Sequence, residues 1–498
     1  MAETPIGSMP ASPPEVGSDP KRWSILAVVV VAQLMVVLDA SIVTIALPSA
    51  QRALHISVAN RQWVITAYTL VFGGLLLLGG RIADFRGRRK MFIVGLIGFA
   101  AASALGGLAV DQAMLFGSRA LQGAFAALMA PGALSILTIT FQDDPGERAK
   151  AFGAYGAVSG AGAAIGVLAG GVLTEYASWR WCLLINVPIA LLAALAASRV
   201  VRETRASGKT GYDVPGAVLA TAGVVSLVYG FTKAVTDGWS SAATLSLISV
   251  GLGLLVAFVA VEARSAYPLL PLRVVLERNR GGSYLAGLLL IVGMFAMFLF
   301  VSYYMQQILH YSAAKAGVAF LPFALGVIVA AGMATPLVPK VGARAVMTAG
   351  LLIAGAGLLW LTQIGVHTSY WTHLLPEQIV MSIGMGLAFP ALASTALTNV
   401  RPEDAGVASS LLSSAQQVGA SLGAALLNTI AATATANYLA SHGTSLAEKG
   451  TVHGFTVAFT VGAAILAAGA IVSAAFLTGP TKVLANPAAA SALEEATT

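Results

Sequence analysis

The sequence predicts an all-α integral membrane protein with fourteen transmembrane helices, arranged as two six-helix halves plus two inserted helices. Hydrophobic residues make up 57% of the 498 residues and charged residues only 10%, whereas soluble globular proteins carry about 25% charged residues. Apolar stretches of about 20 residues, long enough to cross a bilayer, recur along the chain. Basic residues cluster in the short segments between these stretches, as they do in the cytoplasmic loops of membrane proteins.

The apolar stretches define the expected helices. They are residues 24–48, 60–80, 91–110, 113–141, 149–174, 179–201, 213–232, 242–262, 281–308, 314–338, 343–363, 374–398, 405–431 and 453–478. With both termini in the cytoplasm, 21 of the 28 Lys and Arg residues are cytoplasmic, and the other seven are Arg52, Arg61, Arg180, Lys233, Lys315 and Lys449 outside and Arg119 within a span. This asymmetry predicts a multi-pass membrane protein with both termini in the cytoplasm.

The expected domain organisation has five parts. Residues 1–22 form a disordered cytoplasmic tail without a signal peptide, 23–205 the first half, 206–264 the two inserted helices, 281–478 the second half, and 479–498 a disordered cytoplasmic tail. An internal echo supports two related halves, because residues 80–89 after the second span resemble 335–344 after the tenth, and Pro131 has a counterpart in Pro390. Weak internal symmetry of this kind is typical of secondary transporters. For the inserted helices we expect a packing or lipid-facing role.

Other classes of protein are disfavoured. The formal charge of +7 is spread over short clusters rather than one patch, so we expect no nucleic-acid partner. The single cysteine, Cys182, rules out an internal disulfide framework and a cysteine-based metal site. We find no metal-binding cluster, phosphate-binding loop or nucleophile with its base, and therefore expect no enzyme activity, no metal and no cofactor. A non-transporting membrane sensor would need a soluble signalling domain, which the short termini do not supply.

Asp39 is the residue around which the functional prediction is built. It lies about nine residues inside the first span, where a charge costs about 2.5 to 3.5 kcal/mol. In the fourth span, Arg119 and Gln122 share one helical face, and the depths of Arg119 and Asp39 differ by about 5 Å, so the two side chains could reach each other. Burial favours a protonated carboxyl and a nearby arginine favours the ionised form, so a modest rearrangement can switch Asp39 between the two. A purely structural ion pair that locks two helices is the alternative.

Two glycine patterns accompany this pair. Gly80, Asp84, Gly87, Arg88 and Arg89 follow the second span, where the glycines allow a tight turn, Asp84 can pair with an arginine, and the basic cluster anchors the loop at the anionic inner surface. Gly162, Gly166, Gly170 and Gly171 line the fifth span, and glycines every fourth residue let another helix pack closely. For the glycines of the fifth span, ordinary helix packing is the simpler interpretation.

Together these residues resemble the major facilitator superfamily, specifically its fourteen-helix drug:proton antiporter branch, over residues 22–480. The resemblance rests on Leu38-Asp39 with Leu47-Pro48, on the two glycine patterns, on Arg119 with Gln122-Gly123, and on residues 401–410 leading into Gln416-Gln417. It implies that Asp39 carries the proton, that Arg119 is its electrostatic partner, that residues 80–89 form a conformational loop, and that the glycines of the fifth span are the antiporter signature between the halves. The chain departs from the pattern at Val167, where the signature usually has proline, and at Phe85, where an arginine is often found.

Candidates for substrate contact are polar and aromatic residues inside spans. They are Tyr68, Phe72, Gln122, Phe298, Tyr303, Gln306, Gln307, Phe389, Gln416 and Gln417. Apart from Asp39 we identify no carboxylate well inside a span, and we expect Glu377, 258 residues after Arg119, to be a loop residue near the outer mouth rather than a second proton site. So few acids favour large neutral or monocationic amphiphiles as substrates over dications.

The sequence therefore predicts a monomeric proton-coupled antiporter that exports amphiphilic drugs, antibiotics or other toxic small molecules by alternating access, driven by the proton gradient. Its expected partners are the substrate, protons and the lipid bilayer. Export of an endogenous product, such as a biosynthetic metabolite, a siderophore or a lipid, on the same scaffold is the first alternative.

Overall fold

The computed structural model describes residues 21–141, 145–205, 213–265, 268–397, 400 and 405–478, and these contain helices and no β-strand. The two predicted tails, apart from residues 21 and 22, lie outside the described residues. Among the described residues, thirteen helical segments are long and apolar enough to cross a membrane. The fifth predicted span lies in a helix of 32 residues. Within the described residues, its apolar segment Ile165–Tyr176 is too short to count among the thirteen. The predicted all-helical membrane fold is therefore confirmed.

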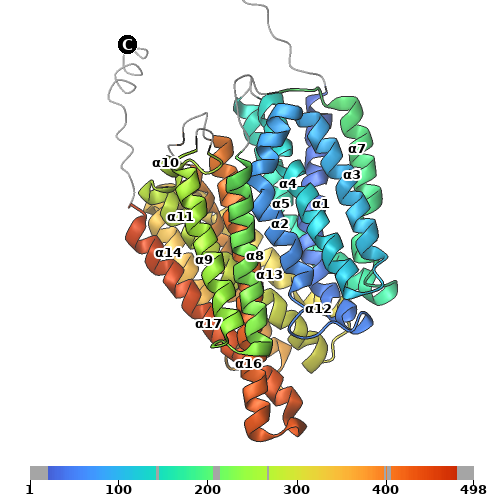
Figure 1. The fold of residues 1–498 in the computed structure, drawn as a ribbon, viewed down its shortest axis with the longest axis vertical. Helices are drawn as coiled ribbons and strands as arrows, with labels where there is room; N and C mark the ends of the chain where they lie inside the picture. Colours follow the sequence, from blue (N-terminus) through green and yellow to red (C-terminus); the bar gives the residue numbers. More distant parts are fainter. Residues whose placement is uncertain are drawn as a thin grey trace, which may run out of the picture.

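The helices follow the predicted order (Figure 1). In the first half they are α1 Arg22–Ala53, α2 Trp63–Arg86, α3 Arg88–Gly107, α4 Gln112–Thr140, α5 Pro145–Tyr176, α6 Trp181–Leu184 and α7 Asn186–Val200. The inserted pair is α8 Val214–Asp237 and α9 Ala242–Glu262, followed by the short α10 Leu272–Val275. In the second half they are α11 Arg278–Tyr303, η1 Tyr304–Ile308, α12 Ala313–Ala319, α13 Leu321–Val341, α14 Ala343–Leu361, η2 Tyr370–Leu374, α15 Leu375–Leu397, α16 Ala405–His442, η4 Thr444–Leu446 and α17 Ala447–Phe476.

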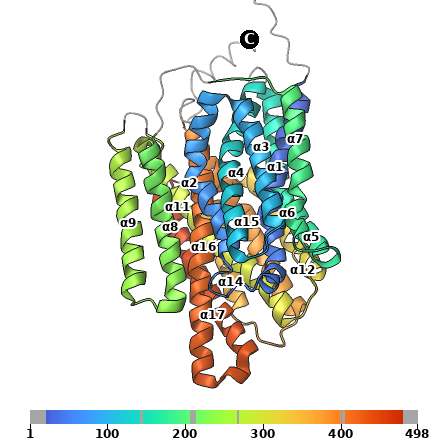
Figure 2. The ribbon, with the colours of Figure 1, turned by 45° about the vertical axis from the view of Figure 1, so that its right-hand side comes forward.

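Prolines explain why two predicted spans are broken. Pro188 has no N–H to donate to the carbonyl of Leu184, where α6 ends, and Pro322 has none for the carbonyl of Val318, near the end of α12. Two other spans contain π-helical turns, η1 after α11 and η2 before α15. At the far end of the chain, α16 continues to His442, beyond the predicted residue 431, and α17 begins at Ala447 rather than 453. These extensions form a hairpin that projects beyond the bundle (Figure 2).

Each half is held together by its own helix contacts. In the first half α1 packs against α5 and α7, and α4 packs against α2 and α3. In the second half α15 packs against α13 and α14, and α17 packs against α11, α14 and α16. Contacts between the two sets run mainly from α2 to α16 and from α5 to α12 and α13. The exact domain boundaries stay a prediction.

The same one-residue turn occurs in both halves. Gly87 joins α2 to α3 with φ of 111°, and Gly342 joins α13 to α14 with φ of 89°. Only glycine adopts such positive φ values without strain. Pro131 and Pro390 lie inside α4 and α15. The two segments that echo each other in sequence therefore have the same local structure.

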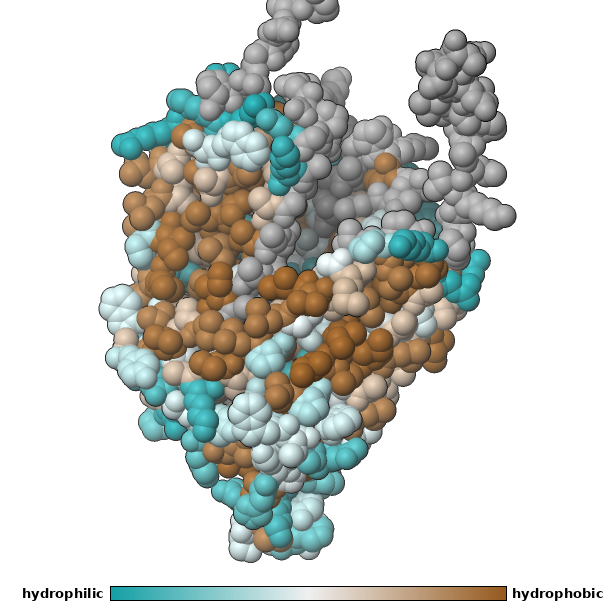
Figure 3. Space-filling model, turned by 180° about the vertical axis from the view of Figure 1, so that it is seen from behind, coloured by the Kyte–Doolittle hydropathy of each residue, from teal (hydrophilic) through white to brown (hydrophobic). Residues whose placement is uncertain are grey.

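The surface agrees with a membrane location. Hydrophobic residues cover a broad band of the face drawn in Figure 3, and hydrophilic residues gather beyond it at both ends. The inserted pair stands to one side of the bundle (Figure 2), where α8 contacts α2 and α16 while α9 packs mainly on α8. Only 11% of the most apolar segment of α9 is buried. Its outer face is therefore suited to contact lipid, as we expected.

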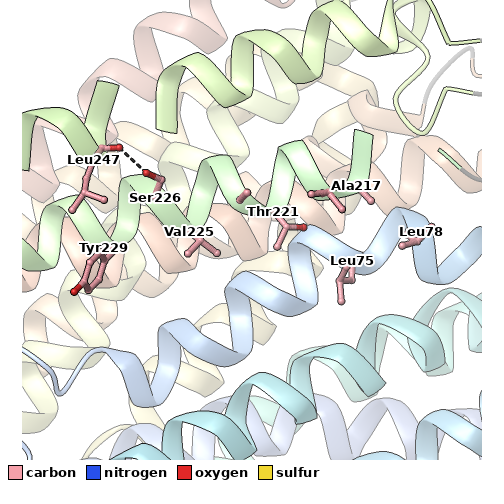
Figure 4. A pocket seen from close by; sticks show the side chains of 10 residues that line it. Leu75, Leu78, Ala217, Thr221, Val225, Ser226, Tyr229 and Leu247 are labelled. Atoms are coloured by element: carbon pink, nitrogen blue, oxygen red, sulfur yellow. Dashed lines mark hydrogen bonds between the residues drawn. The ribbon is translucent and has the colours of Figure 1, made fainter. Parts of the chain in front are cut away.

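A hollow of about 590 Å³ lies between α2, α8 and α9 (Figure 4). Its lining is mainly apolar and includes Leu75, Val225 and Tyr229. The hydroxyl of Ser226 on α8 donates to the carbonyl of Leu247 on α9 over 2.7 Å, which ties the inserted pair together at this wall. None of the predicted substrate-contact residues lines the hollow. We assign it to the lipid-facing surface of the inserted pair.

Candidate functional site

Asp39 on α1 and Arg119 on α4 form a buried ion pair. The Arg119 Nη1 atom lies 2.6 Å from Asp39 Oδ2, and Asp39 is 0% and Arg119 1% exposed. Removing one member of a buried pair leaves an uncompensated charge and typically costs about 3–5 kcal/mol. The two side chains that the sequence places at similar depth are therefore in direct contact, and each compensates the buried charge of the other.

Two amide groups complete the environment of the Asp39 carboxylate. Gln122 Nε2 and Asn186 Nδ2 donate to Asp39 Oδ1 over 3.1 Å and 2.8 Å. Gln122 also donates to Ser103 Oγ over 2.7 Å and accepts a hydrogen bond from Arg119 Nη1 over 2.7 Å. Every contact to the carboxylate comes from a donor, so the arrangement is complementary to the ionised form of Asp39.

The other side of Arg119 is held by α2. Its Nε donates to the carbonyl of Val64 over 2.9 Å, and its guanidinium carbon lies 4.5 Å from the centre of the Tyr68 ring. Phe72 packs against Tyr68 with 5.6 Å between ring centres. Tyr68, Phe72 and Gln122, which we predicted as substrate-contact residues, are thus buried beside the ion pair in this conformation.

Asn186 is a site residue that the sequence reasoning missed. It is the first residue of α7, fully buried, and it reaches Asp39 because the helix is interrupted between Leu184 and Asn186. The signal for it was present: an amide side chain inside an apolar stretch, two residues before Pro188. Proline breaks the preceding turn and lets that side chain enter the bundle.

The glycines of α5 bring its backbone against α1 beside Asp39. A Cβ added at Gly166 would lie 3.0 Å from the carbonyl oxygen of Leu38, and one at Gly170 would lie 2.8 Å from that of Ile42. Gly162 faces Val37 one turn away. These are contacts that only a residue without a side chain permits. The predicted close helix packing at these glycines is therefore confirmed.

Gly171, the fourth glycine of this set, faces the other half. An added Cβ would lie 2.7 Å from the carbonyl oxygen of Ala313 on α12. Val167, which replaces the usual proline, offers its carbonyl oxygen to the same helix, 2.8 Å from where a Cβ of Gly317 would be. One helix thus contacts the ion-pair helix on one side and the second half on another.

The predicted conformational loop is shorter than expected. Gly80 is not part of the turn, because α2 continues to Arg86, and it packs instead near Pro131 of α4, with 3.3 Å from an added Cβ. Gly87 alone makes the turn. Asp84 Oδ1 pairs with Arg88 over 2.8 Å, as expected for an arginine partner.

Glu203 secures this turn from the end of the first half. Its two carboxylate oxygens accept hydrogen bonds from the backbone N–H groups of Arg89 and Lys90 over 3.2 Å and 3.1 Å. These N–H groups belong to the first turn of α3, where negative charge is stabilised. The Arg89 side chain donates to the carbonyl of Ser198 on α7. Residues 401–404 of the last predicted motif lie outside the described residues.

A polar cluster joins the two halves at the end of the bundle where α2 begins, which we call the distal end. Arg61, only 4% exposed, donates from Nε to Asn428 Oδ1 on α16 over 2.7 Å. Asn428 donates to Gln62 Oε1 over 2.7 Å, and Gln62 donates to Thr232 of α8 over 3.0 Å. Arg61 was counted among the basic residues on the outer side, and the structure shows that its side chain is buried between the halves.

Tyr303 connects this cluster to α1. Its ring lies 4.2 Å from the Arg61 guanidinium carbon, and its hydroxyl donates to Gln51 Oε1. Gln306 donates to the carbonyl of Ile45 over 3.2 Å. Tyr303 of α11 and Gln306 of η1, both predicted substrate-contact residues, therefore close the distal contact with α1 in this conformation.

The remaining predicted substrate-contact residues are dispersed. Phe298 stacks on Phe320 with 5.4 Å between ring centres and is half-buried, as are Phe389, Gln416 and Gln417. The Cβ of Gln417 lies 2.8 Å from where a Cβ of Gly73 would be, at the contact between α16 and α2. Gln307 is exposed.

Glu377 differs from its prediction. We expected a loop residue, but it lies in the first turn of α15 and is 0% exposed. A buried carboxyl therefore exists in the second half as well as in the first. The prediction failed because the apolar stretch was taken to begin at residue 374, whereas the helical span begins at Tyr370 of η2.

Comparison with known proteins gives the family of this chain. The sequence profile described as Major Facilitator Superfamily matches residues 29–424 and, in an overlapping match, 283–496. The puromycin resistance protein pur8 of Streptomyces alboniger is 52% identical over 459 residues, which cover 91% of each chain. The cephamycin export protein CmcT of Amycolatopsis lactamdurans is 41% identical over 418 residues, covering 82% of this chain and 86% of that protein.

A solved structure agrees in fold. The crystal structure of the POT family transporter PepTSo matches with a TM-score of 0.66, covering 91% of this chain and 97% of that chain, at 16% sequence identity. This similarity concerns the fold alone. The sequence match over most of the chain agrees with the thirteen helical segments of the described residues that are long and apolar enough to cross a membrane, and with the repeated turn at Gly87 and Gly342. The chain belongs to the Major Facilitator Superfamily.

Proposed function

We propose that this protein exports amphiphilic drugs or antibiotics across the bacterial cytoplasmic membrane in exchange for protons, by alternating access of its two halves. The names of its relatives support export of toxic small molecules, since they include a puromycin resistance protein, a cephamycin export protein and a tetracenomycin C resistance and export protein. The distribution of basic residues supports cytoplasmic termini. The transporter acts as a monomer without a cofactor and uses the proton gradient as its energy source.

The observation that carries the proton coupling is the buried Asp39 carboxylate with its three donors, Arg119, Gln122 and Asn186. All three contacts to the Asp39 carboxylate come from hydrogen-bond donors, and a protonated carboxyl would lose part of them. A proton that reaches Asp39 therefore weakens the bond to Arg119 and loosens α1 from α4. Since α5 packs backbone to backbone on the same turn of α1, this change is transmitted to a helix that contacts the second half.

Coupling follows if the substrate and the proton favour different states of this switch. A bound substrate that stabilises the ionised form of Asp39 releases the proton, and a proton taken up from outside favours release of the substrate. Thermodynamic linkage makes the two effects reciprocal. No covalent chemistry is required.

The closed distal end supports alternating access. Arg61, Tyr303 and Gln306 join the halves there, and further into the bundle Thr69 Oγ1 lies 2.7 Å from Ser421 Oγ. Rocking one half against the other around a central site requires these contacts to break and reform in each cycle. The large neutral or monocationic amphiphiles predicted as substrates remain our proposal for the substrate class.

Export of a product made by the same cell is the second candidate function. It is favoured by relatives whose names describe export, among them a probable actinorhodin transporter of Streptomyces coelicolor. The two functions use the same machinery and differ only in the compound.

The test is transport by the purified protein in liposomes that contain a pH-sensitive dye. Puromycin and a panel of other antibiotics are added at an imposed pH gradient, and both drug uptake and proton movement are recorded. We expect at least one compound to move protons in the opposite direction to itself. Compound movement that is indifferent to the pH gradient would contradict proton exchange. Growth of cells with and without the protein, in the presence of the same compounds, distinguishes resistance to external drugs from export of a cell product.

A further inference from the structure

Glu377 is a buried carboxyl without a partner. It is 0% exposed, and neither carboxylate oxygen has a hydrogen-bond partner among the described residues. The described residues also contain no ion pair to Glu377. An isolated ionised carboxylate is very costly to bury, so a group in this situation takes up a proton. Glu377 is therefore a neutral carboxylic acid in the closed conformation.

Its position corresponds to that of Arg119 in the first half. Arg119 lies seven residues after the first residue of α4, Gln112, and Glu377 lies seven residues after the first residue of the η2 and α15 span, Tyr370. Both spans are the fourth of their half and carry an internal proline, Pro131 or Pro390. The second half thus has a buried ionisable group at the same depth, but with no opposite charge.

Among the described residues, the elements packed against α15 supply no charge that compensates Glu377. α13 carries Lys340 and α14 carries Arg344, both next to the Gly342 turn, at the end of the bundle away from Glu377. On α11, Arg278, Arg280 and Tyr284 also lie at that opposite end. The titratable side chains of α16 are Tyr438 and His442, near its final turn.

Titratable groups at the distal side are already bonded elsewhere. The Tyr303 hydroxyl donates to Gln51, and the Tyr370 hydroxyl donates to the carbonyl of Ala319 over 2.8 Å. His373 of η2 contacts Thr372 through Nδ1 over 2.9 Å. Next to Glu377, the fully buried Gln378 likewise has no hydrogen-bond partner for its amide oxygen or nitrogen within the part of the chain that the structure describes. The adjacent side chains of Glu377 and Gln378 are therefore both buried without hydrogen-bond partners among the described residues in this conformation.

We propose that Glu377 is a second proton-binding site of the transport cycle, which rests on the proton exchange proposed above. In the closed conformation the proton resides on its carboxyl. When the halves part, water enters at this depth and accepts the proton, and the carboxylate is hydrated by that water and by the Gln378 amide. Protonation from the other side of the membrane restores the neutral acid before the site closes. Each cycle then exchanges one substrate for two protons, one on Asp39 and one on Glu377.

The proton count in liposomes tests this proposal. Radiolabelled puromycin uptake and dye-reported proton movement are measured on the same sample, and their ratio is compared for wild type, Glu377→Gln, Glu377→Asp and Glu448→Gln. Glu448 is the matched control, an exposed acid in the first turn of α17. We expect two protons per puromycin for wild type, Glu377→Asp and Glu448→Gln, and a twofold lower ratio for Glu377→Gln. A structural role for Glu377 would change the rate of uptake but not this ratio.

The outcomes separate the two proposals. A wild-type ratio of one, or an unchanged ratio in Glu377→Gln, overturns the second site and leaves proton exchange intact. Puromycin uptake without any proton movement, or no uptake at all, overturns proton-coupled export of puromycin and the second site with it. If Glu377→Gln does not fold, the wild-type ratio alone decides, since a single-site exchanger moves one proton per substrate.

Discussion

Arg61 Nε donates to Asn428 Oδ1 over 2.7 Å, although 367 residues separate them in the sequence. The bond joins the segment before α2 to α16, and so it fastens the first half to the second at the distal end. Because Arg61 is almost fully buried, its positive charge is stabilised by this acceptor and by the Tyr303 ring. The hydrogen bond between Arg61 and Asn428 therefore acts as a lock, that is, a contact between the halves that has to break when the distal end opens.

Asn428→Ala should favour the open distal end. A hydrogen bond to a charged group contributes about 1.5–3 kcal/mol, so its loss should raise exposure of the interface about tenfold to a hundredfold. The reporter is Ser302→Cys in a Cys182→Ala background, because Ser302 is 0% exposed and its hydroxyl bonds to the carbonyl of Thr44 across the interface. Its labelling rate by a membrane-impermeant maleimide is measured. Asn437→Ala, at an exposed position of the same helix, serves as the control. Equal labelling rates in the reporter protein alone, with Asn428→Ala and with Asn437→Ala would argue against the lock.

Asp39→Asn should abolish all substrate-driven proton movement, including that on Glu377, because the transport cycle stops without a group at position 39 that can bind and release a proton, while the protein stays folded. An asparagine accepts hydrogen bonds from Arg119 but cannot carry the proton. The measurement is dye-reported proton movement after puromycin addition in liposomes, with thermal unfolding in detergent to check the fold. Asp111→Asn is the matched control, because Asp111 is an exposed N-cap and asparagine caps helices equally well. Wild-type proton movement in Asp39→Asn would exclude Asp39 as the carrier.

Arg119→Ala should destabilise the protein by about 3–5 kcal/mol, since it leaves a buried carboxylate without its opposite charge. The double variant Asp39→Asn with Arg119→Gln should recover much of this loss, because no uncompensated charge remains. Both variants should lack proton-coupled transport. Chemical unfolding in detergent gives the free energies. Equal instability of the single and double variants would show that lost packing, rather than the unpaired charge, is the cause.

Gly166→Ala should push α5 away from α1. An added Cβ would lie 2.0 Å from Ser41 Oγ and 3.0 Å from the Leu38 carbonyl, and overpacking of this kind costs about 1–3 kcal/mol. Transport should fall with stability, because the displaced turn of α1 carries Asp39. Gly253→Ala on α9 is the control, since no atom beyond the adjacent backbone of its own helix lies within 4 Å of its added Cβ. A melting temperature for Gly166→Ala equal to that of Gly253→Ala would refute the close contact.

Much of the fold could be read from the sequence, because apolar length and charge asymmetry are local properties. The Asp39 and Arg119 contact followed from the same logic, since two opposite charges at one depth in a membrane have few other partners. The repeat of the Gly87 turn at Gly342 was visible as a sequence echo because positive φ restricts the position to glycine.

What the sequence did not reveal depends on where helices break and on contacts between distant segments. Asn186 enters the Asp39 site only because Pro188 interrupts a span that looked continuous. Glu377 was misplaced because a π-helical turn extends its span outward by several residues. Arg61 was counted as an outer-loop charge, since nothing local shows that Asn428 and Tyr303 cover it.

The inserted helix α8 is fastened to both moving halves, through Gln62 on the α2 side and through Thr429 of α16, whose hydroxyl donates to the Phe231 carbonyl over 2.8 Å. When α2 and α16 separate, α8 cannot follow both. One attachment has to be released in every cycle, at about 0.5–1.5 kcal/mol for a typical hydrogen bond. Under the alternating access proposed above, these two hydroxyl contacts of the inserted pair therefore favour the conformation in which the distal end is closed.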